Sequence, residues 1–241
     1  MSVPRFHLPE AAPGVRLELP AHQAHHAREV LRLRPGTPVR VFDGSGNEYE
    51  GQIEELQRRH ATLRLGRPVD PRPESPLRIV LAFSALKGDR MEWVIQKATE
   101  LGVAEIRPLV SMRTDATARP ALLGTRQDRW DKVASGAAEQ CGRAVVPHIA
   151  PTVLLDQLLA EPFEGARLMF SAEGGAPLRT LPANTSALLL VGPPGGWESS
   201  ELEHAARAGF RALSLGPRIL RTETAAVAAI AALQALWGDL G

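Results

Sequence analysis

Cysteine is almost absent from this chain of 241 residues, since Cys141 is the only one. A single cysteine excludes a framework of internal disulfides. Long apolar runs are also missing: no stretch reaches about 18 residues, so we expect no membrane-spanning helix. The first residues, MSVPRFHLPEAAPG, lack the basic stretch followed by an apolar one that marks a secretory signal. Together these absences predict a cytoplasmic protein.

Lysine is scarce as well. Only Lys87, Lys97 and Lys132 are lysines, so 25 of the 28 basic residues are arginines, and the formal net charge is only +1. Arginine offers a planar fork of donors that suits phosphates and guanine edges. A GC-rich coding bias explains most of this arginine count, however. Charge alone is therefore weak evidence for a nucleic-acid partner.

Metal ligands are few. His22, His25 and His26 cluster without a nearby cysteine or a clear carboxylate partner. His22 and His26 would share one face of a helix, so a metal pair is an alternative to a solvated or RNA-facing helix. We expect no metal site.

Proline divides the chain. Residues 67–78 read RPVDPRPESPLR, with four prolines in twelve positions, which is typical of a linker. We therefore expect one domain over 1–72 and a second over 73–241. The first shows period-two alternation typical of strands and one helical segment, which favours a small β-barrel. Its predicted strands are 15–19, 38–43, 48–56 and 61–66, and its predicted helix is 21–31.

The second part alternates strands and helices, which predicts an α/β domain with a mostly parallel sheet covered on both faces. In its fourth helix, Ser200 stands three residues before Glu203, a capping-box pattern. Its last helix is apolar nearly all round, which indicates a core or a subunit interface. The predicted strands are 78–86, 105–111, 166–172, 186–192 and 210–216, and the helices are 89–101, 126–141, 152–160, 199–208 and 223–237.

Ligands of parallel sheets bind beyond the carboxyl ends of the strands, where two loops stand out. The first, VGPPGGWESSE (191–201), has glycines that permit close backbone approach and a helix N-terminus behind them. A tight turn with no ligand is an equal alternative. The loop is neither GxGxxG nor GxxxxGK[ST], which argues against a nucleotide-binding dehydrogenase or a triphosphate site.

The second loop, SLGPRILRTETAA (214–226), places polar residues directly before the apolar last helix. Charged groups there are costly unless they are paired or functional. Glu223 and Arg221 are therefore candidates for catalysis. The alternative is that Glu223 complements the helix dipole while Arg221 pairs with a carboxylate.

Both loops resemble those of the RsmE family, which are 16S ribosomal RNA uridine-N3 methyltransferases of the SPOUT class. The matching runs are GPRILRTETAA (216–226) and GPPGG (192–196). Segments 87–114, 129–147 and 25–49 are also similar to the family, so the resemblance covers nearly the whole chain. The family's Gly-Pro-Glu-Gly-Gly has Pro194 in place of its glutamate here, so no role of that glutamate is carried over.

This resemblance implies a SPOUT domain with a C-terminal trefoil knot, an exception to the rule against knots, preceded by a PUA-like barrel that docks RNA. It implies S-adenosyl-L-methionine as cofactor, 16S ribosomal RNA in the small ribosomal subunit as partner, and a homodimer. By position the cofactor cradle would comprise Ser171, Glu173, Gly192, Gly195, Gly196, Ser214, Leu215, Gly216, Ile219 and Leu220.

The chemistry implied is methylation of uracil N3, which becomes a good nucleophile only as its proton leaves. Arg221 is the candidate for stabilising charge on O2 or O4, and Glu223 for base or orienting group. Cys141 lies on an apolar helix face, which disfavours the thiolate addition needed at C5. Candidates for RNA contact, with solvated side chains as the alternative, are Arg28, Arg32, Arg34, Gln140 and Arg143.

Three rival functions stay open. A knotted methyltransferase could act on transfer RNA or on a ribose hydroxyl. A non-catalytic RNA-binding or assembly factor could retain the fold, an idea to which Pro194 gives slight support. The dehydrogenase is the weakest, because both its glycine pattern and its acidic ribose partner are missing.

Overall fold

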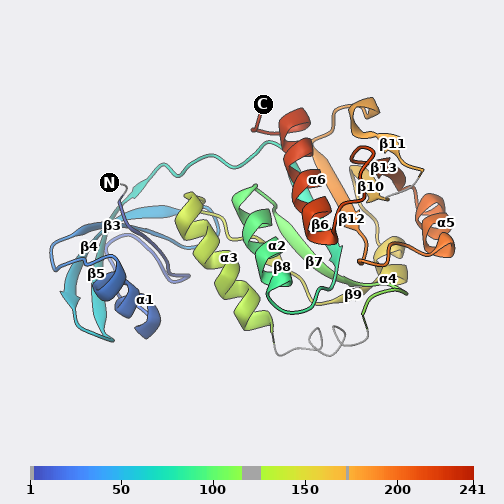
Figure 1. Cartoon of the computed structure of the whole chain (residues 1–241). Helices are drawn as coiled ribbons and strands as arrows, with labels where there is room; N and C mark the ends of the chain where they lie inside the picture. Colours follow the sequence, from blue (N-terminus) through green and yellow to red (C-terminus); the bar gives the residue numbers. More distant parts are fainter. Residues whose placement is uncertain (1–2, 116–125, 172–173) are drawn as a thin grey trace. The chain divides into compact units, whose positions relative to one another are not determined.

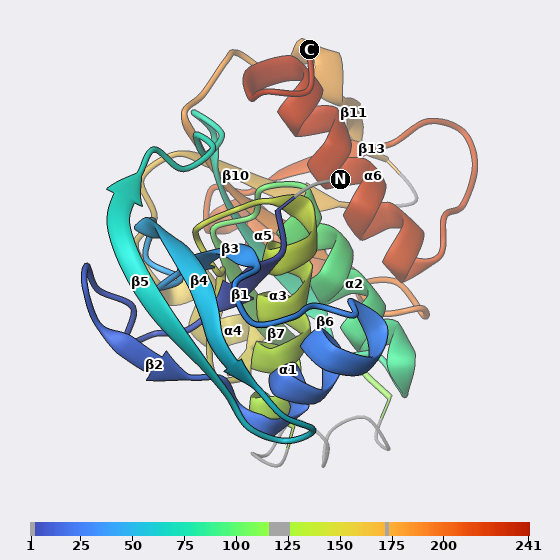
Figure 2. The same ribbon diagram turned by 90° about the vertical axis from the view of Figure 1, so that its left-hand side faces the viewer.

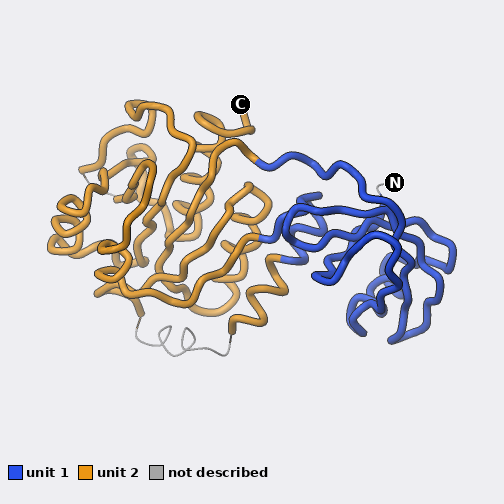
Figure 3. Tube along the Cα trace, turned by 180° about the vertical axis from the view of Figure 1, so that it is seen from behind, with its two compact units in different colours: residues 1–74, 135–146 blue, residues 75–134, 147–241 orange. Residues whose placement is uncertain are grey.

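The computed structural model describes residues 3–115, 126–171 and 174–241. These form two compact units: unit 1 comprises 1–74 and 135–146, and unit 2 comprises 75–134 and 147–241 (Figure 3). Helix α3 (Gln127–Cys141) contributes residues to both units. The sequence pattern did not separate residues 135–146 from the second half, and the boundary at residue 72 stays a prediction.

Unit 1 is built on a five-stranded sheet in the order β1-β3-β4-β5-β2. All of its neighbouring strands are antiparallel except β1 and β3, which run parallel. The alternation seen in the sequence places Val39 and Val41 in the core. Its elements are β1 (Arg5–His7), β2 (Arg16–Glu18), α1 (Ala21–His25), the π-helical η1 (His26–Val30), β3 (Pro38–Phe42), β4 (Glu48–Leu56) and β5 (Ala61–Val69).

Residues 135–146 complete the polar and apolar packing of unit 1. Ala138 and Ala144 pack against the buried ring of Phe42. The Arg5 guanidinium donates to the carbonyl oxygens of Ala138 and Arg143, each at 3.0 Å. These contacts tie strand β1, which is too short to show a periodicity in the sequence, to the end of α3.

A largely buried carboxylate lies in the same region of unit 1. Oε1 of Glu139 accepts hydrogen bonds from the backbone N–H of His7 and from Nε2 of Gln23, both at 2.8 Å. Burial raises the pKa of Glu139 above its usual value, and it outweighs the opposing effects of the His7 N–H, the Arg5 charge and the Gln23 amide.

Unit 2 contains an eight-stranded sheet in the order β11-β13-β10-β12-β6-β7-β8, with β9 also paired to β7. Every pair in it is parallel. The strands are β6 (Arg78–Ser84), β7 (Glu105–Val110), β8 (His148–Ile149), β9 (Val153–Leu154), β10 (Ala166–Phe170), β11 (Ala176–Pro177), β12 (Ser186–Val191) and β13 (Arg211–Ser214). A mostly parallel sheet is therefore confirmed. Strand β11, of two residues, is too short to predict, and β9 occupies the start of the predicted helix 152–160, which begins only at Leu155.

Helices cover both faces of this sheet. Figures 1 and 2 show α2 and α6 side by side over one face, where α6 contacts β6 and β12. Helices α4 and α5 pack on the other face, against Val80, Met169 and Leu188. The helices are α2 (Asp89–Glu100), α4 (Leu155–Ala160), the 3₁₀ turn η3 (Leu178–Thr180), α5 (Ser199–Arg207) and α6 (Thr222–Trp237).

Two details of these helices differ from the prediction. The capping box at Ser200 and Glu203 is wrong, because α5 begins at Ser199 and Glu198 is its N-cap residue. Glu201 instead accepts the backbone N–H of Glu198 at 2.9 Å. Helix α6 buries one face, including Ala226, Ile230 and Leu233, rather than its whole circumference within a single chain. In residues 3–115, 126–171 and 174–241, no helix is long and apolar enough to cross a membrane.

Candidate cofactor pocket at the carboxyl edge of the sheet

A pocket of about 690 Å³ lies where several strands of unit 2 end. Its wall includes the residues that follow β10, the Gly-rich turn that follows β12, and the loop between β13 and α6. Because parallel strands end at the same edge, these three segments, far apart in the sequence, meet there. The pocket therefore unites both loops that the sequence singled out.

Most of the predicted cradle lines this pocket. Glu173 lies outside the described residues, and Arg221 and Glu223 also belong to the wall. The cradle residues found in the wall are Ser171, Gly192, Gly195, Gly196, Ser214, Leu215, Gly216, Ile219 and Leu220. Their placement together is a structural fact, whereas their role in binding stays a prediction.

The turn after β12 requires glycine at two positions. Gly196 has a φ of +72°, in the left-handed region that favours glycine, and its N–H donates to the carbonyl of Pro193 at 2.8 Å. A Cβ on Gly192 would lie 2.8 Å from Cε2 of Trp197. The two glycines thus serve the turn itself, which leaves backbone groups exposed along the pocket.

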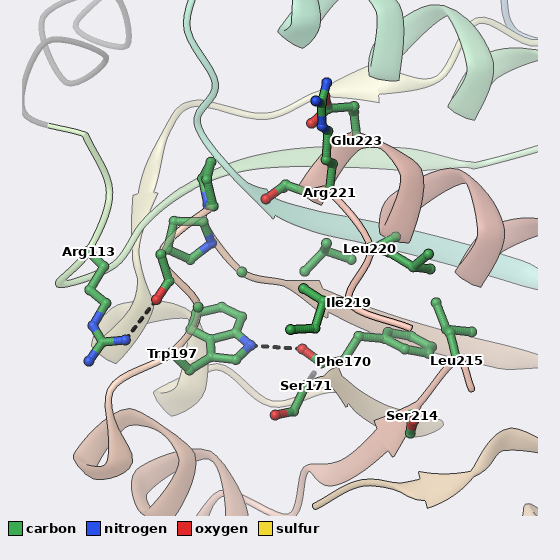
Figure 4. Close-up of a pocket in the computed structure, with 18 of the residues that line it drawn as sticks. Arg113, Phe170, Ser171, Trp197, Ser214, Leu215, Ile219, Leu220, Arg221 and Glu223 are labelled. Carbon is green, nitrogen blue, oxygen red and sulfur yellow. Dashed lines mark hydrogen bonds between the residues drawn. The ribbon is translucent and has the colours of Figure 1, made fainter. Parts of the chain in front are cut away.

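Trp197 is a residue of the wall that the sequence analysis missed. Its side chain is buried, and its Nε1 donates to the carbonyl oxygen of Phe170 at 2.9 Å (Figure 4). This bond joins the Gly-rich turn to the end of β10. An aromatic residue directly after Gly-Gly was the only signal in the sequence.

The loop after β13 is open to solvent. Ser214 Oγ donates to the carbonyl of Gly216 at 3.1 Å, and Gly216 has a φ of +100°. Ile219 is 83% exposed although it is a large apolar residue. Ile219 thus adds apolar surface to the wall of the pocket.

Arg221 and Glu223 lie toward one end of the pocket, away from Ser171 and Ser214 (Figure 4). Arg221 is exposed and forms the N-cap of α6, and among the described residues no ion pair of its guanidinium occurs. Oε2 of Glu223 is buried and has no hydrogen-bond partner within the described part of the chain. An unpartnered buried carboxylate oxygen is costly, which indicates a partner that arrives with a ligand.

Three further arginines line the pocket and were not predicted, Arg90, Arg113 and Arg218. Arg113 reaches the wall from the loop after β7. Its Nη1 donates to the carbonyl of Gly195 and its Nε to Glu198, both at 2.7 Å (Figure 4 draws the first bond). Glu198 raises the pKa of Arg113 through this hydrogen bond, so the guanidinium is fixed in its charged form.

The predicted RNA contacts all belong to unit 1 and fall into two groups. Arg28, Arg32, Arg34 and Gln140 are exposed. Arg32 is the one non-glycine residue with positive φ within 3–115, 126–171 and 174–241, at +54°. Arg143 is only 9% exposed, and its guanidinium binds the carboxylate of Glu74, with an Nη2–Oε2 distance of 2.6 Å. This burial does not favour contact between Arg143 and RNA.

Other candidate chemistry lies elsewhere or is not found. Cys141 belongs to unit 1, whereas every residue that lines the pocket belongs to unit 2. In the described ranges no group of three or more His, Cys, Asp or Glu side chains could hold a metal ion.

Comparison with known proteins identifies the chain. Residues 73–234 match the family model of an RNA methyltransferase domain, and residues 19–66 match that of an RNA methyltransferase PUA domain. The ribosomal RNA small subunit methyltransferase E of Synechocystis is 34% identical over 95% of this chain and 76% of its own length. The chain belongs to the ribosomal RNA small subunit methyltransferase E family. The Bacillus subtilis member is 29% identical over 88% of this chain and 86% of its own.

Two solved structures share the fold over the full length of the chain. The Neisseria gonorrhoeae methyltransferase E, bound to S-adenosyl methionine, is 38% identical, with a TM-score of 0.90 over 100% of both chains. A methyltransferase from Legionella pneumophila, in complex with the same cofactor, is 37% identical, with a TM-score of 0.93 over 100% of both chains. The α/β fold with an N-terminal PUA-like domain is therefore confirmed.

Proposed function

We propose that this member of the methyltransferase E family is a ribosomal RNA methyltransferase that uses S-adenosyl-L-methionine and modifies N3 of a uridine in small-subunit RNA. The observation that carries the proposal is the pocket itself. Glycine turns from two loops expose backbone groups at the carboxyl edge of a parallel sheet, in a fold shared with relatives that bind this cofactor.

The residues present fit such a cofactor. The pocket wall combines exposed backbone with apolar side chains such as Leu215, Ile219 and Leu220. The unpartnered Oε2 of Glu223 leaves one acceptor for the target base. When bound, S-adenosyl-L-methionine supplies an activated methyl group on a sulfonium, so the protein needs neither a metal nor a covalent intermediate.

The chain's own residues then act on the uracil. The exposed guanidinium of Arg221 stabilises the negative charge that develops on O2 or O4 as the N3 proton leaves. Oε2 of Glu223 orients that N–H or accepts its proton. The pocket must also align N3 with the methyl group. N3 lies on the pairing edge, so the base must be unpaired or turned out of a helix before it enters.

The remaining parts of the proposal concern partners. Residues 1–72 dock the small ribosomal subunit, with Arg28, Arg32 and Arg34 exposed for phosphate contact. Two copies pair through α6, where Leu236 is 49% exposed in the single chain, and through the mouth of the pocket, where Ile219 is exposed. The chain between β12 and α6 forms the trefoil knot, and the protein works in the cytoplasm.

Replacement of Arg221 tests the reaction. Arg221→Ala should bind S-adenosyl-L-methionine as the wild type does in a calorimeter, because Arg221 lies toward the end of the pocket away from Ser171 and Ser214 (Figure 4). Its turnover should fall about 100-fold, the usual cost of removing one group that stabilises developing charge. Arg129→Ala is the matched control, since Arg129 is exposed and pairs with Glu92 on α2.

Nucleoside analysis of the methylated RNA fixes the product. N3-methyluridine supports the proposal, whereas a methylated ribose or a product in transfer RNA contradicts the substrate assignment. Absence of cofactor binding by the wild type would indicate an RNA-binding factor without catalysis. Unchanged turnover of Arg221→Ala would remove this residue from the mechanism.

A further inference from the structure

The tip of the Gly-rich turn, residues 194–196, has little packing of its own. A Cβ on Gly196 would meet no atom within 4 Å, and residues 194–196 are exposed. A turn with so few neighbours samples other conformations unless something outside it holds it in place. The structure shows such a restraint in the loop that follows β7.

Arg113 of that loop binds the turn at two points. Nη1 donates to the carbonyl oxygen of Gly195, and Nε donates to Oε1 of Glu198, each at 2.7 Å (Figure 4). The two acceptors stand on either side of Gly196 and Trp197. The planar fork of a guanidinium can hold both acceptors at once, which the single ammonium of a lysine does not reproduce.

A buried carboxylate also joins the loop after β7 to the Gly-rich turn. Glu201 is 6% exposed, and its two oxygens accept the backbone N–H groups of Met112 and Glu198 at 2.8 and 2.9 Å. A carboxylate that accepts two backbone hydrogen bonds in a buried position fixes both donors. Glu201 therefore fixes the backbone at both ends of the contact that Arg113 makes. Met112 directly precedes Arg113, and Glu198 is the ion-pair partner of Arg113.

The loop that carries Arg113 is itself anchored to the sheet. Oγ1 of Thr114 accepts the backbone N–H of Ser111 at 2.8 Å and lies 2.9 Å from Oγ of Ser84, the last residue of β6. All three residues are buried. A continuous polar chain therefore runs from the end of β6, through the loop after β7, to the turn after β12.

We infer that Arg113 is a positioning residue for cofactor binding, which holds the turn over 193–198 in its binding conformation before the cofactor arrives. This inference rests on the proposed function of the pocket. Arg113 acts through the backbone carbonyl of Gly195 and through Glu198. Because the turn is already ordered, none of the free energy of cofactor binding is spent on ordering this segment.

Calorimetry with S-adenosyl-L-methionine on the full-length protein tests the inference. Arg113→Gln should raise the Kd about fivefold, because the net value of a hydrogen bond that is partly exposed to water is modest. KM for the cofactor should rise by the same factor, while kcat and KM for RNA should stay within about twofold of wild type. Arg113→Lys should bind the cofactor nearly as weakly as Arg113→Gln. If only the positive charge of Arg113 mattered, lysine would restore the wild-type Kd.

Two comparisons make the test decisive. Arg129→Gln, which removes an exposed, ion-paired arginine outside the pocket, should leave the Kd unchanged. Glu198→Gln should raise the Kd, and the double variant Arg113→Gln/Glu198→Gln should not add both effects. A wild-type Kd for Arg113→Gln, or a fall in kcat without a change in KM for the cofactor, would overturn the inference. If wild-type protein itself fails to bind the cofactor, the proposed function falls first.

Discussion

Removal of one buried hydrogen bond of the pocket should be measurable as a loss of stability. Trp197→Phe keeps an aromatic ring behind the Gly-rich turn but removes the donor that reaches the carbonyl of Phe170 at 2.9 Å. Trp197 is only 8% exposed, so water cannot readily replace that donor. The variant therefore removes this hydrogen bond and part of the ring volume, and it changes no other contact of the fold directly.

The magnitude follows from these two losses. The missing hydrogen bond costs about 1 kcal/mol net, and the smaller ring leaves a cavity worth on the order of 1 kcal/mol. The free energy of unfolding should thus fall by about 2 kcal/mol. With a urea dependence of about 2 kcal/mol per M, the unfolding midpoint should fall by about 1 M.

Urea unfolding followed by far-ultraviolet circular dichroism measures this shift, and Trp93→Phe is the matched control. Trp93 lies on α2 and is 42% exposed, so the same substitution there should cost less than about 0.5 kcal/mol. Equal midpoints for Trp197→Phe and Trp93→Phe would show that the bond to Phe170 contributes nothing, and the reasoning would be refuted.

Two further predictions concern glycine and a carboxylate. Gly192→Ala would place a Cβ 2.8 Å from Cε2 of Trp197, so the indole must shift, and calorimetry should show cofactor affinity at least about tenfold weaker; unchanged affinity would separate this glycine from the pocket. Burial raises the pKa of Glu139, so the stability that its protonation contributes is present in acid and is lost as the pH rises through its folded-state pKa. Thermal melts should therefore show Glu139→Gln gaining stability relative to wild type as the pH rises above about 4, the ordinary pKa of a glutamate, and a constant difference would contradict the raised pKa.

Much of the fold could be predicted because periodicity records burial. The strands and helices of unit 2 long enough to show a period were predicted close to their observed bounds, as β6, α2 and β12 illustrate. The short strands β1 and β11 show no period, although β2, also of three residues, was predicted within 15–19. The capping box failed for a local reason: Ser200 fits the pattern, but the helix begins one residue before it.

The pocket loops could be predicted from their glycines, but the contacts that hold them could not. Arg113 and Glu198 are 85 residues apart in the chain, and no local spacing relates them. Trp197, which follows β12, contacts Phe170 at the end of β10. The two residues meet only because β10 and β12 are neighbours in the sheet, and the sequence does not show this order of strands. Arg143 was predicted to contact RNA, but its side chain is buried in the fold, and nothing in the local sequence shows this burial.

The composition of unit 1 from two separate stretches limits how this protein can be taken apart. A shortened chain that ends near residue 72 would leave Phe42 without Ala138 and Ala144, and Arg5 without the two carbonyl oxygens that it binds. The amino-terminal half is therefore not a domain that a single gene fusion could transfer to another enzyme. Any transplantation would have to carry residues 135–146 with it.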